Sequence, residues 1–338
     1  MRDLRPLALT MGEPAGIGGE IALKAWLERE THHIPPFYLI DDPDHLDALK
    51  RRLGWPVSLK PIERPEEAPE IFKSALPVLV HPLPRQPVPG SPQQENAGSV
   101  IAAIDLAVDH VRSGAAEAIV TNPIHKKVLV DAGFRHVGHT DYLAELAGDN
   151  ARSIMMLACP DLRVVPVCVH MSLRESIEAL TAEKIIKTTQ ATARALKSDF
   201  GIEQPHIALT GLNPHAGEEG AMGHEEIEII RPSIERMKRE GLSVRGPEPA
   251  DTLFHERART GYDAAVCMYH DQALIPIKTL DFHGTVNITL GLPFVRTSPD
   301  HGTAFEIAGT GVANAESLVA ALKTASVMAR RRRGDRLH

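Results

Sequence analysis

Short apolar runs alternate with amphipathic stretches along most of this chain. The runs at 7–11, 37–40 and 118–121 are short and almost wholly apolar, as buried strands are. Between such runs, stretches like 99–112 and 182–197 carry apolar residues at helical spacing. A repeated order of strand, helix and strand implies crossover connections and a mostly parallel sheet. The pattern therefore predicts an α/β fold.

Three further apolar runs each lead to a histidine, at 164–169, 207–212 and 264–269. The histidines are His170, His215 and His270. Because the carboxyl ends of parallel strands meet at one edge of a sheet, the three imidazoles are expected to converge. Three imidazoles with an open fourth position are typical of a catalytic site for zinc or a similar cation. The chain holds 17 histidines, so surface or core positions are the alternative.

Two proline-rich stretches interrupt the alternation of strands and helices. The first, 64–94, contains the run His81 to Gly90, whose prolines no helix would tolerate. We expect it to be a surface excursion. The second, 245–252, is also expected to be irregular.

Length and composition limit the class of protein. A chain of 338 residues favours two lobes, and 43% apolar residues with only 4% aromatic ones suit a parallel sheet covered by helices. The net charge of −7 argues against a general nucleic-acid binder. No segment approaches the length needed to span a bilayer, and the expected location is the cytoplasm.

Two smaller features are expected to be structural. Cys159, Cys168 and Cys267 lie in or beside apolar runs without a C-x-x-C pair, which predicts buried free thiols. The run Arg330 to Arg333 ends an alanine-rich helical stretch, where cations complement the helix dipole and are expected to face water.

Two glycine-bearing segments could contact a cofactor. Gly12 and Gly16 lie in a turn between a strand and a helix, and Gly302, Thr303 and Ala304 form a second segment of small residues. Glycines permit close backbone approach, and exposed amides can hold an anion. The first turn is not a dinucleotide fingerprint, because an isoleucine follows where G-x-G-x-x-G requires its third glycine. A tight turn without a ligand is the alternative.

Together the two segments resemble those of the isocitrate and isopropylmalate dehydrogenase superfamily. The resemblance implies a three-layer α/β/α fold with two lobes around a central cleft, and NAD or NADP bound without a Rossmann domain. We expect residues 1–125 and 285–338 to form the first lobe, on the cofactor side. Residues 126–284 would form the second, with the metal ligands and the dimer contacts.

A closer resemblance covers nearly the whole chain, and it is to the 4-hydroxythreonine-4-phosphate dehydrogenase family. The matching stretches are Gly12-Glu-Pro-Ala-Gly-Ile-Gly, Pro123-Ile-His-Lys, Gly138-His-Thr, Leu212-Asn-Pro-His-Ala-Gly-Glu, Pro249-Ala-Asp-Thr-Leu-Phe, Tyr269-His-Asp-Gln and Val286-Asn-Ile-Thr-Leu-Gly-Leu-Pro-Phe-Val-Arg-Thr-Ser. The resemblance implies that the three histidines bind a divalent cation such as zinc, magnesium or cobalt. It also implies a homodimer whose metal site is completed across the subunit interface.

The resemblance implies a substrate site made of His139, Thr140, Lys278, Asn287 and Arg296. The residue types suit a small phosphorylated substrate, because Arg296 offers a bidentate fork and Lys278 a point charge. Asn287 and Thr140 can add hydrogen bonds. Solvated surface cations are the alternative for Lys278 and Arg296, and Thr140 could instead be a helix N-cap beside His139.

The residues carrying the proton chemistry are less defined by sequence. Lys278, Asp271 and Asp251 are the candidate catalytic residues. Either aspartate could orient a metal-bound histidine, accept a proton or cap a helix. The stretch His224-Glu-Glu-Ile-Glu lacks the second histidine of H-E-x-x-H and is expected to be a charged first turn.

The activity implied by the resemblance is metal-dependent oxidation of 4-phosphooxy-L-threonine by NAD or NADP. The product, 2-amino-3-oxo-4-phosphooxybutanoate, would decarboxylate to 3-amino-2-oxopropyl phosphate in pyridoxine biosynthesis. Alternatives within the class are threonate or erythronate 4-phosphate, or a cis-dihydrodiol. A metal-dependent hydrolase would need no nicotinamide, and a metal-dependent binding protein would show no turnover.

Overall fold

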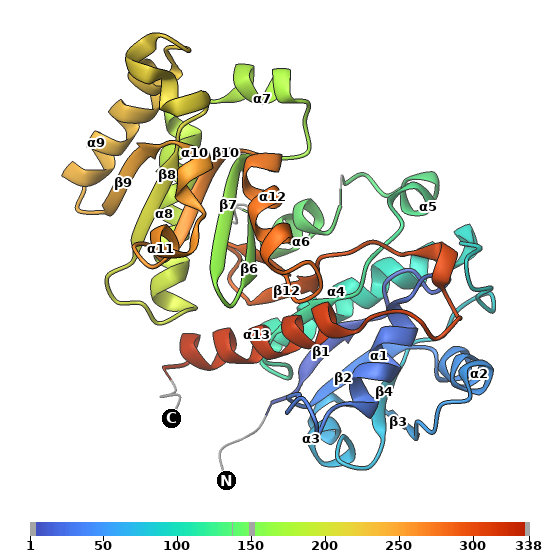
Figure 1. Cartoon of the computed structure of the whole chain (residues 1–338). Coiled ribbons are helices and arrows are strands. Elements are labelled where there is room, and N and C mark those ends of the chain that lie inside the picture. Colours follow the sequence, from blue (N-terminus) through green and yellow to red (C-terminus); the bar gives the residue numbers. More distant parts are fainter. Residues whose placement is uncertain (1–4, 137, 149–152, 335–338) are drawn as a thin grey trace. The chain divides into compact units, whose positions relative to one another are not determined.

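The computed structural model describes residues 5–136, 138–148 and 153–334 (Figure 1). The chain divides into two compact units, which we call unit 1 and unit 2. Unit 1 contains the chain up to 153 together with 292–330, and unit 2 contains 154–291 together with the chain from 331. Unit 1 therefore extends past the lobe boundary expected at 125 and resumes at 292 instead of 285.

The sheet of unit 1 is parallel throughout its described strands. Its strands follow the order β3 (Leu59–Ile62), β4 (Leu76–Val80), β2 (Phe37–Asp41), β1 (Leu7–Thr10), β5 (Ile119–Thr121) and β12 (Arg296–Pro299). The strands predicted at 7–11, 37–40 and 118–121 are confirmed as β1, β2 and β5.

The prediction that 64–94 is a surface excursion is wrong for residues 64–80, whereas the run His81 to Gly90 contains no helix, as predicted. The stretch contains the helical turns η1 (Pro65–Glu67) and α3 (Ala68–Ile71), and then strand β4, which pairs with β2 on one side and β3 on the other. Four of the five β4 residues are buried, because Leu76-Pro-Val-Leu-Val is an apolar run despite its proline. The second proline-bearing strand, β3, lies at the sheet edge, where a missing donor is tolerated.

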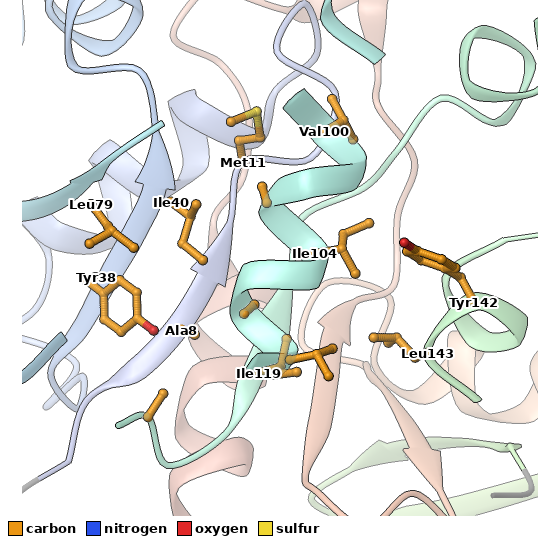
Figure 2. Packing of buried hydrophobic residues seen from close by; sticks show 14 of the residues in the cluster. Ala8, Met11, Tyr38, Ile40, Leu79, Val100, Ile104, Ile119, Tyr142 and Leu143 are labelled. Atoms are coloured by element: carbon orange, nitrogen blue, oxygen red, sulfur yellow. The ribbon is translucent and has the colours of Figure 1, made fainter. Parts of the chain in front are cut away.

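Helices cover both faces of the unit 1 sheet. These helices are α1 (Gly18–Leu27), α2 (Pro43–Leu53), α4 (Ala97–Ser113), α5 (Lys126–Asp131), α6 (His139–Ala147) and α13 (Glu316–Arg332), with short turns η2 (Gln94–Asn96) and η5 (Phe305–Ile307). One face of the sheet packs against α4, whose buried Val100 and Ile104 belong to the same hydrophobic cluster as Ile40 (Figure 2). On the opposite face Phe37 packs against Phe72, and Thr297 donates a hydrogen bond to the Ala321 carbonyl of α13.

The sheet of unit 2 is parallel except around β6. Its strands follow the order β11 (Val286–Leu290), β6 (Ile154–Cys159), β7 (Leu162–Cys168), β10 (Ala264–Tyr269), β8 (His206–Thr210) and β9 (Ser243–Glu248). Strand β6 is antiparallel to both neighbours, whereas β7, β10, β8 and β9 run parallel. The expectation of an irregular stretch over 245–252 is wrong at both ends. Strand β9 continues to Glu248 at the sheet edge, where Pro247 is tolerated, and helix α10 begins at Ala250.

Helices also lie on both faces of this second sheet. They are α7 (Leu173–Ala179), α8 (Ala182–Ser198), α9 (Arg231–Arg239), α10 (Ala250–Leu253), α11 (Glu256–Arg259) and α12 (His270–Leu280), with the turns η3 (Pro214–Gly220) and η4 (Glu226–Ile230). Ala265 and Cys267 of β10 pack with Ala273 and Ile277 of α12 in one buried cluster. Residues between them in β10 point to the other face, which α8 contacts.

The expectations for the cysteines and the arginine run have different outcomes. All three cysteines are buried free thiols, as predicted. Arg332 does not simply face water: its Nε lies 2.6 Å from Oδ1 of Asp199, its Nη2 lies 2.8 Å from Oδ2, and Asp199 is fully buried. A buried carboxylate requires such a partner. Within the described ranges, no helix is both long and apolar enough to cross a membrane.

Candidate active site

The three histidines follow three neighbouring parallel strands of unit 2, in the sheet order β7, β10, β8. His170 comes two residues after β7, His270 is the first residue of α12 directly after β10, and His215 lies in η3 after β8. This confirms the predicted strands and places the histidines after the carboxyl ends of adjacent strands. Such an edge is where α/β folds commonly bind ligands.

Two of the three imidazoles lie together. The ring centroids of His170 and His270 are 6.0 Å apart, and both residues line a pocket of about 460 Å³ with Leu173, Tyr269 and Asp271. Across residues 5–136, 138–148 and 153–334, no group of three or more His, Cys, Asp or Glu side chains could hold a metal ion. The three-histidine centre therefore stays a prediction.

Asp271 is placed to orient His270. Its Oδ1 lies 2.7 Å from Nδ1 of the imidazole. A carboxylate that accepts from Nδ1 leaves the other ring nitrogen, Nε2, with its lone pair in the neutral imidazole, the form that binds a metal. This is the arrangement in which a metal-ligating histidine is commonly held. The residue types of His170 and His270 therefore suit two positions around a divalent cation, and of the roles open to Asp271 the contact matches that of orienting a ligand.

His215 lies in an unusual turn. Its φ is +52°, and the left-handed conformation continues through Ala216, Gly217, Glu218 and Glu219. Non-glycine residues at positive φ carry a conformational cost, and such turns are found at functional sites. Glu226 lies with Glu228 in the first turn of η4, as predicted for this charged stretch. Glu226 is also buried, and it accepts hydrogen bonds from the chain that leads to His215.

Arg296 is a buried cation at the start of β12 in unit 1. Its Nε and Nη2 donate to the Thr121 hydroxyl at 3.2 and 2.6 Å, so the end of β5 orients the guanidinium. Burial lowers the pKa of Arg296 to about 10, which leaves the side chain protonated at neutral pH. The alternative of a solvated surface cation is wrong for Arg296, because only 3% of the residue is exposed.

His139 is the first residue of α6 in the same unit. Its Nε2 is buried and has no hydrogen-bond partner among the residues that the structure describes. Burial lowers its pKa well below the ordinary value, and the positive charges of Arg296 and Lys126 lower it further. A neutral imidazole with an unsatisfied nitrogen suits contact with a bound ligand. The N-cap of α6 is Gly138, so the alternative role of Thr140 as N-cap is wrong.

The remaining candidates lie in unit 2. Lys278 occupies the last turn of α12, half-buried, with Nζ 5.1 Å from the Phe282 ring centroid. Asn287 is half-buried in β11, opposite Leu157. Asp251 is exposed in the first turn of the short helix α10. The predicted substrate residues thus belong to both units, and their roles stay predictions.

The two glycine-bearing segments of unit 1 pack against each other. Ile17 donates to the Thr303 carbonyl at 3.1 Å, and a Cβ at Gly16 would lie 2.9 Å from that oxygen. Gly12 has φ +72°, and a Cβ there would lie 2.6 Å from the Pro123 carbonyl. Both glycines are therefore required for backbone contact. Gly302 differs, because it is exposed and has open space around the position of a Cβ.

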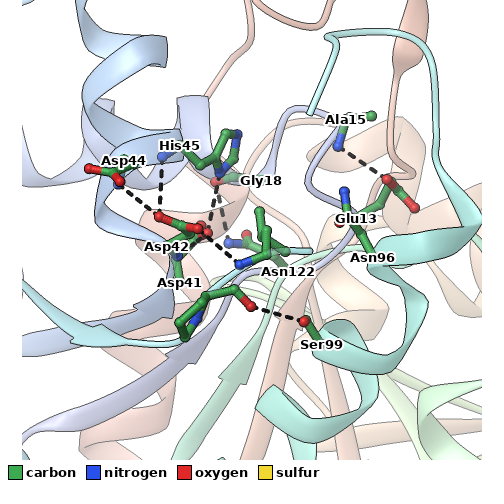
Figure 3. Close-up of polar contacts among 12 residues, drawn as sticks. Glu13, Ala15, Gly18, Asp41, Asp42, Asp44, His45, Asn96, Ser99 and Asn122 are labelled. Atoms are coloured by element: carbon green, nitrogen blue, oxygen red, sulfur yellow. Dashed lines mark hydrogen bonds and ion pairs between the residues drawn. The ribbon is translucent and has the colours of Figure 1, made fainter. Parts of the chain in front are cut away.

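The amides of the first turn are already occupied. Ala15 donates to Glu13 Oε1 at 3.1 Å, Gly16 donates to the Glu13 carbonyl, and Glu13 itself donates to the Pro123 carbonyl. Figure 3 shows the Glu13 contact and, nearby, Asn122 joined to Gly18. These donors are not open to an anion. Contact with a cofactor thus fits the 302–304 segment better, with Gly12 and Gly16 supporting it through close packing.

Several of these polar contacts escaped the sequence reasoning. Thr121 bonds to Arg296 itself, whereas Gln272 and Glu226 bond to the segment that precedes His215. The residue types alone carry no signal for these contacts. For Gln272 and Glu226 a weak signal existed, because each stands close to a distinctive histidine motif in the sequence.

Fold and site together define the class, a two-unit α/β protein whose candidate residues follow the ends of parallel strands. The predicted α/β class is confirmed. The chain belongs to the family described as pyridoxal phosphate biosynthetic protein PdxA, which matches residues 33–325. The resemblance identified from the sequence motifs is therefore confirmed.

Curated relatives and solved structures agree with this family. A 4-hydroxythreonine-4-phosphate dehydrogenase from Methylorubrum populi is 53% identical over 97% of this chain and 96% of its own. The crystal structure of a protein of that name from Klebsiella pneumoniae has a TM-score of 0.86 at 38% identity, covering 96% of this chain and 99% of that one. A terephthalate 1,2-cis-dihydrodiol dehydrogenase from Burkholderia xenovorans has a TM-score of 0.63 at 26% identity, with 99% of each chain covered.

Proposed function

We propose that this protein oxidises 4-phosphooxy-L-threonine with NAD or NADP in a metal-dependent reaction. The observation that carries the proposal is the set of histidines after three adjacent parallel strands, with His270 held by Asp271. The family and the names of the similar proteins supply the substrate class. The proposed product is 2-amino-3-oxo-4-phosphooxybutanoate.

The oxidation separates a hydride from a proton. The carbon that bears the substrate hydroxyl gives its hydride to the nicotinamide, and the hydroxyl proton goes to a base. A divalent cation at His170, His215 and His270 would supply Lewis acidity that lowers the hydroxyl pKa and polarises the new carbonyl. The product is a β-keto acid, which loses carbon dioxide to give 3-amino-2-oxopropyl phosphate. Asp251 and Lys278 are the proposed proton-transfer residues, and Asp271 orients His270.

Arg296 is proposed to bind a negatively charged group of the substrate, its phosphate or its carboxylate. The guanidinium stays protonated and is held in place by Thr121, so it can present a fixed fork to a phosphate or carboxylate. His139 would satisfy its buried Nε2 on the same ligand. Thr140, Lys278 and Asn287 are proposed to complete the site with hydrogen bonds and one further positive charge.

The nicotinamide cofactor is proposed to lie against Gly302, Thr303 and Ala304. Gly302 is exposed, the other two are half-buried, and Ala304 has φ +46°, so backbone is presented there without bulky side chains. Gly12 and Gly16 are not proposed to contact the cofactor directly. Their role is to let the backbone of the first turn pack closely against its neighbours, which include Thr303.

A homodimer is also proposed, with the metal site at the subunit interface. Beside His170, Met171 is 38%, Leu173 57% and Ile177 41% exposed. Exposed apolar side chains gathered next to a polar site are typical of an interaction surface. A second copy of the chain seated there would cover them and bring further side chains toward His170 and His270.

A comparison of candidate substrates, each measured separately, tests this proposal. Initial rates of nicotinamide reduction should be measured with 4-phosphooxy-L-threonine, threonate 4-phosphate, erythronate 4-phosphate and unphosphorylated 4-hydroxythreonine, each with NAD and with NADP. The proposal expects the highest kcat/KM for 4-phosphooxy-L-threonine and a large loss without the phosphate. Preference for a sugar-acid phosphate would overturn the amino substrate, and turnover of a cis-dihydrodiol alone would overturn the phosphorylated class.

A further inference from the structure

We infer that two buried side chains, Gln272 and Glu226, are positioning residues that hold the His215 turn in register with His270. Both side chains form hydrogen bonds with the same short segment, 211–213. Neither residue touches an imidazole in any described contact. The inference rests on the proposed function, because it assigns these residues a role toward the proposed metal centre.

Gln272 joins the histidine-bearing ends of β8 and β10. It lies two residues after His270 in α12 and is 8% exposed. Its Oε1 accepts from the Thr210 hydroxyl and from the Met268 amide, both at 2.7 Å. Its Nε2 donates to the Gly211 carbonyl at 2.7 Å. One side chain therefore ties the end of β8 to the strand and helix that carry His270.

The Glu226 carboxylate accepts hydrogen bonds from the two residues that follow Gly211. Its Oε1 accepts from the backbone amides of Leu212 and Asn213 at 2.7 and 2.8 Å. Its Oε2 accepts from the Asn213 side-chain amide at 3.0 Å. The residue is 1% exposed, so its charge is satisfied mainly by these donors. Hydrogen bonds to a buried carboxylate are stronger than neutral ones, and the segment leading to His215 is accordingly fixed.

The backbone around this carboxylate leaves little freedom. A Cβ at Gly217 would lie 2.6 Å from Glu226 Oε2, and a Cβ at Gly211 would lie 3.0 Å from Oε1. Gly217 also belongs to the left-handed turn that begins at His215. Such a turn persists only when its surroundings determine it. Glu226 is packed directly against that turn and bonded to the segment before it, which makes it the group that sets where His215 points.

Metal titration of the full-length, metal-free protein tests the inference without any need for turnover. Calorimetric binding of cobalt ion should be compared for wild type, Glu226→Gln, Glu226→Ala and Gln272→Ala. Loss of a supporting contact behind a metal ligand weakens metal affinity by about 10–100-fold. We expect that loss for the two alanine variants and a smaller one for Glu226→Gln, which keeps one oxygen for the two backbone amides.

The matched control is Glu225→Ala. Glu225 is the preceding residue and accepts from the Asn213 side chain at 2.7 Å and from backbone at 224–225, but no described contact joins it to a backbone amide of 211–213. The inference expects near wild-type cobalt affinity for this variant. Equal losses for Glu225→Ala and Glu226→Ala would overturn the specific role of Glu226. Folded Glu226→Gln and Gln272→Ala proteins that bind cobalt like the wild type would overturn the inference as a whole.

His215→Ala separates this inference from the proposed function. If His215→Ala binds cobalt as tightly as wild type, the proposed metal site fails, and the positioning role fails with it. If His215→Ala loses affinity while all Glu226 and Gln272 variants keep it, only the positioning role fails. A double variant, Glu226→Gln with His215→Ala, should be no worse than His215→Ala alone, because Glu226 acts through that histidine.

Discussion

Replacement of Arg296, a single buried cation, tests whether this side chain binds the substrate. Arg296 is 3% exposed and its fork is held by the Thr121 hydroxyl. Arg296→Ala removes the positive charge, whereas Arg296→Lys keeps the charge and loses the fork. If the substrate phosphate or carboxylate binds there, the alanine variant should lose most binding and the lysine variant part of it.

The expected magnitude follows from the contacts that are lost. A hydrogen bond to a charged group contributes about 1.5–3 kcal/mol, and a bidentate arginine makes a pair of them. We take about 3 kcal/mol for Arg296→Ala, which corresponds to a roughly 150-fold rise in KM, and about half of that free energy for Arg296→Lys, which corresponds to a rise of roughly tenfold. Thr121→Val, which leaves the charge but removes its anchor, should resemble the lysine variant, and Thr121→Ser should resemble wild type.

The assay combines initial-rate kinetics with direct calorimetric binding of the substrate and with thermal unfolding to confirm that each variant folds. Because burial lowers the pKa of Arg296 only to about 10, substrate affinity should not depend on this group at neutral pH and should fall as pH rises through that value. A folded Arg296→Ala protein with wild-type KM and substrate affinity would refute the assignment.

Three further predictions concern other contacts. Asp271→Asn removes the charged acceptor 2.7 Å from His270 Nδ1 and should weaken cobalt binding about tenfold in a calorimetric titration, whereas Asp251→Asn should leave it unchanged. Arg332→Ala leaves the buried Asp199 carboxylate without its guanidinium and should lower the free energy of unfolding by about 3 kcal/mol in urea titration, with Lys323→Ala as an exposed control on the same helix. Burial would lower the pKa of His45, but the Asp41 carboxylate 3.2 Å away raises it overall. The stability from this pair is therefore complete below the unfolded pKa of about 6.5 and is lost as pH rises through the higher folded pKa, so His45→Gln should flatten that slope in urea titrations across the pH range.

Strands β1, β2, β5, β7, β8 and β10 could be predicted because burial on both faces gives continuous apolar runs. Strand β10 was predicted to the residue at 264–269, and each histidine motif could be placed after its strand from the pattern alone. Strand β4 cannot be recognised in the same way, because it lies inside the proline-rich stretch 64–94, although the run itself is buried. Local signals were conflicting there, and tertiary burial decided between them.

The supporting contacts of the site could not be predicted in the same way. Arg296 meets Thr121 across 175 positions of sequence, and Gln272 meets Thr210 across 62. Such pairs depend on strand order and register, which an isolated sequence pattern does not specify. The charged stretch at Glu226 predicts a charged first turn, which is confirmed, but nothing in the pattern indicates that this one carboxylate is buried against backbone amides. The candidate residues could be predicted from the sequence, but their hydrogen-bond partners could be identified only from the folded structure.

Nicotinamide reduction by chelator-treated protein tests the central claim most directly. Wild type and His215→Ala should be mixed with 4-phosphooxy-L-threonine and the preferred nicotinamide, and the absorbance of reduced nicotinamide followed before and after a divalent metal is restored. The account predicts no reduction by wild type until metal is added, rapid reduction afterwards, and none by His215→Ala in either condition. Full activity of the chelated wild type, or of His215→Ala, would contradict a histidine metal centre as the site of oxidation.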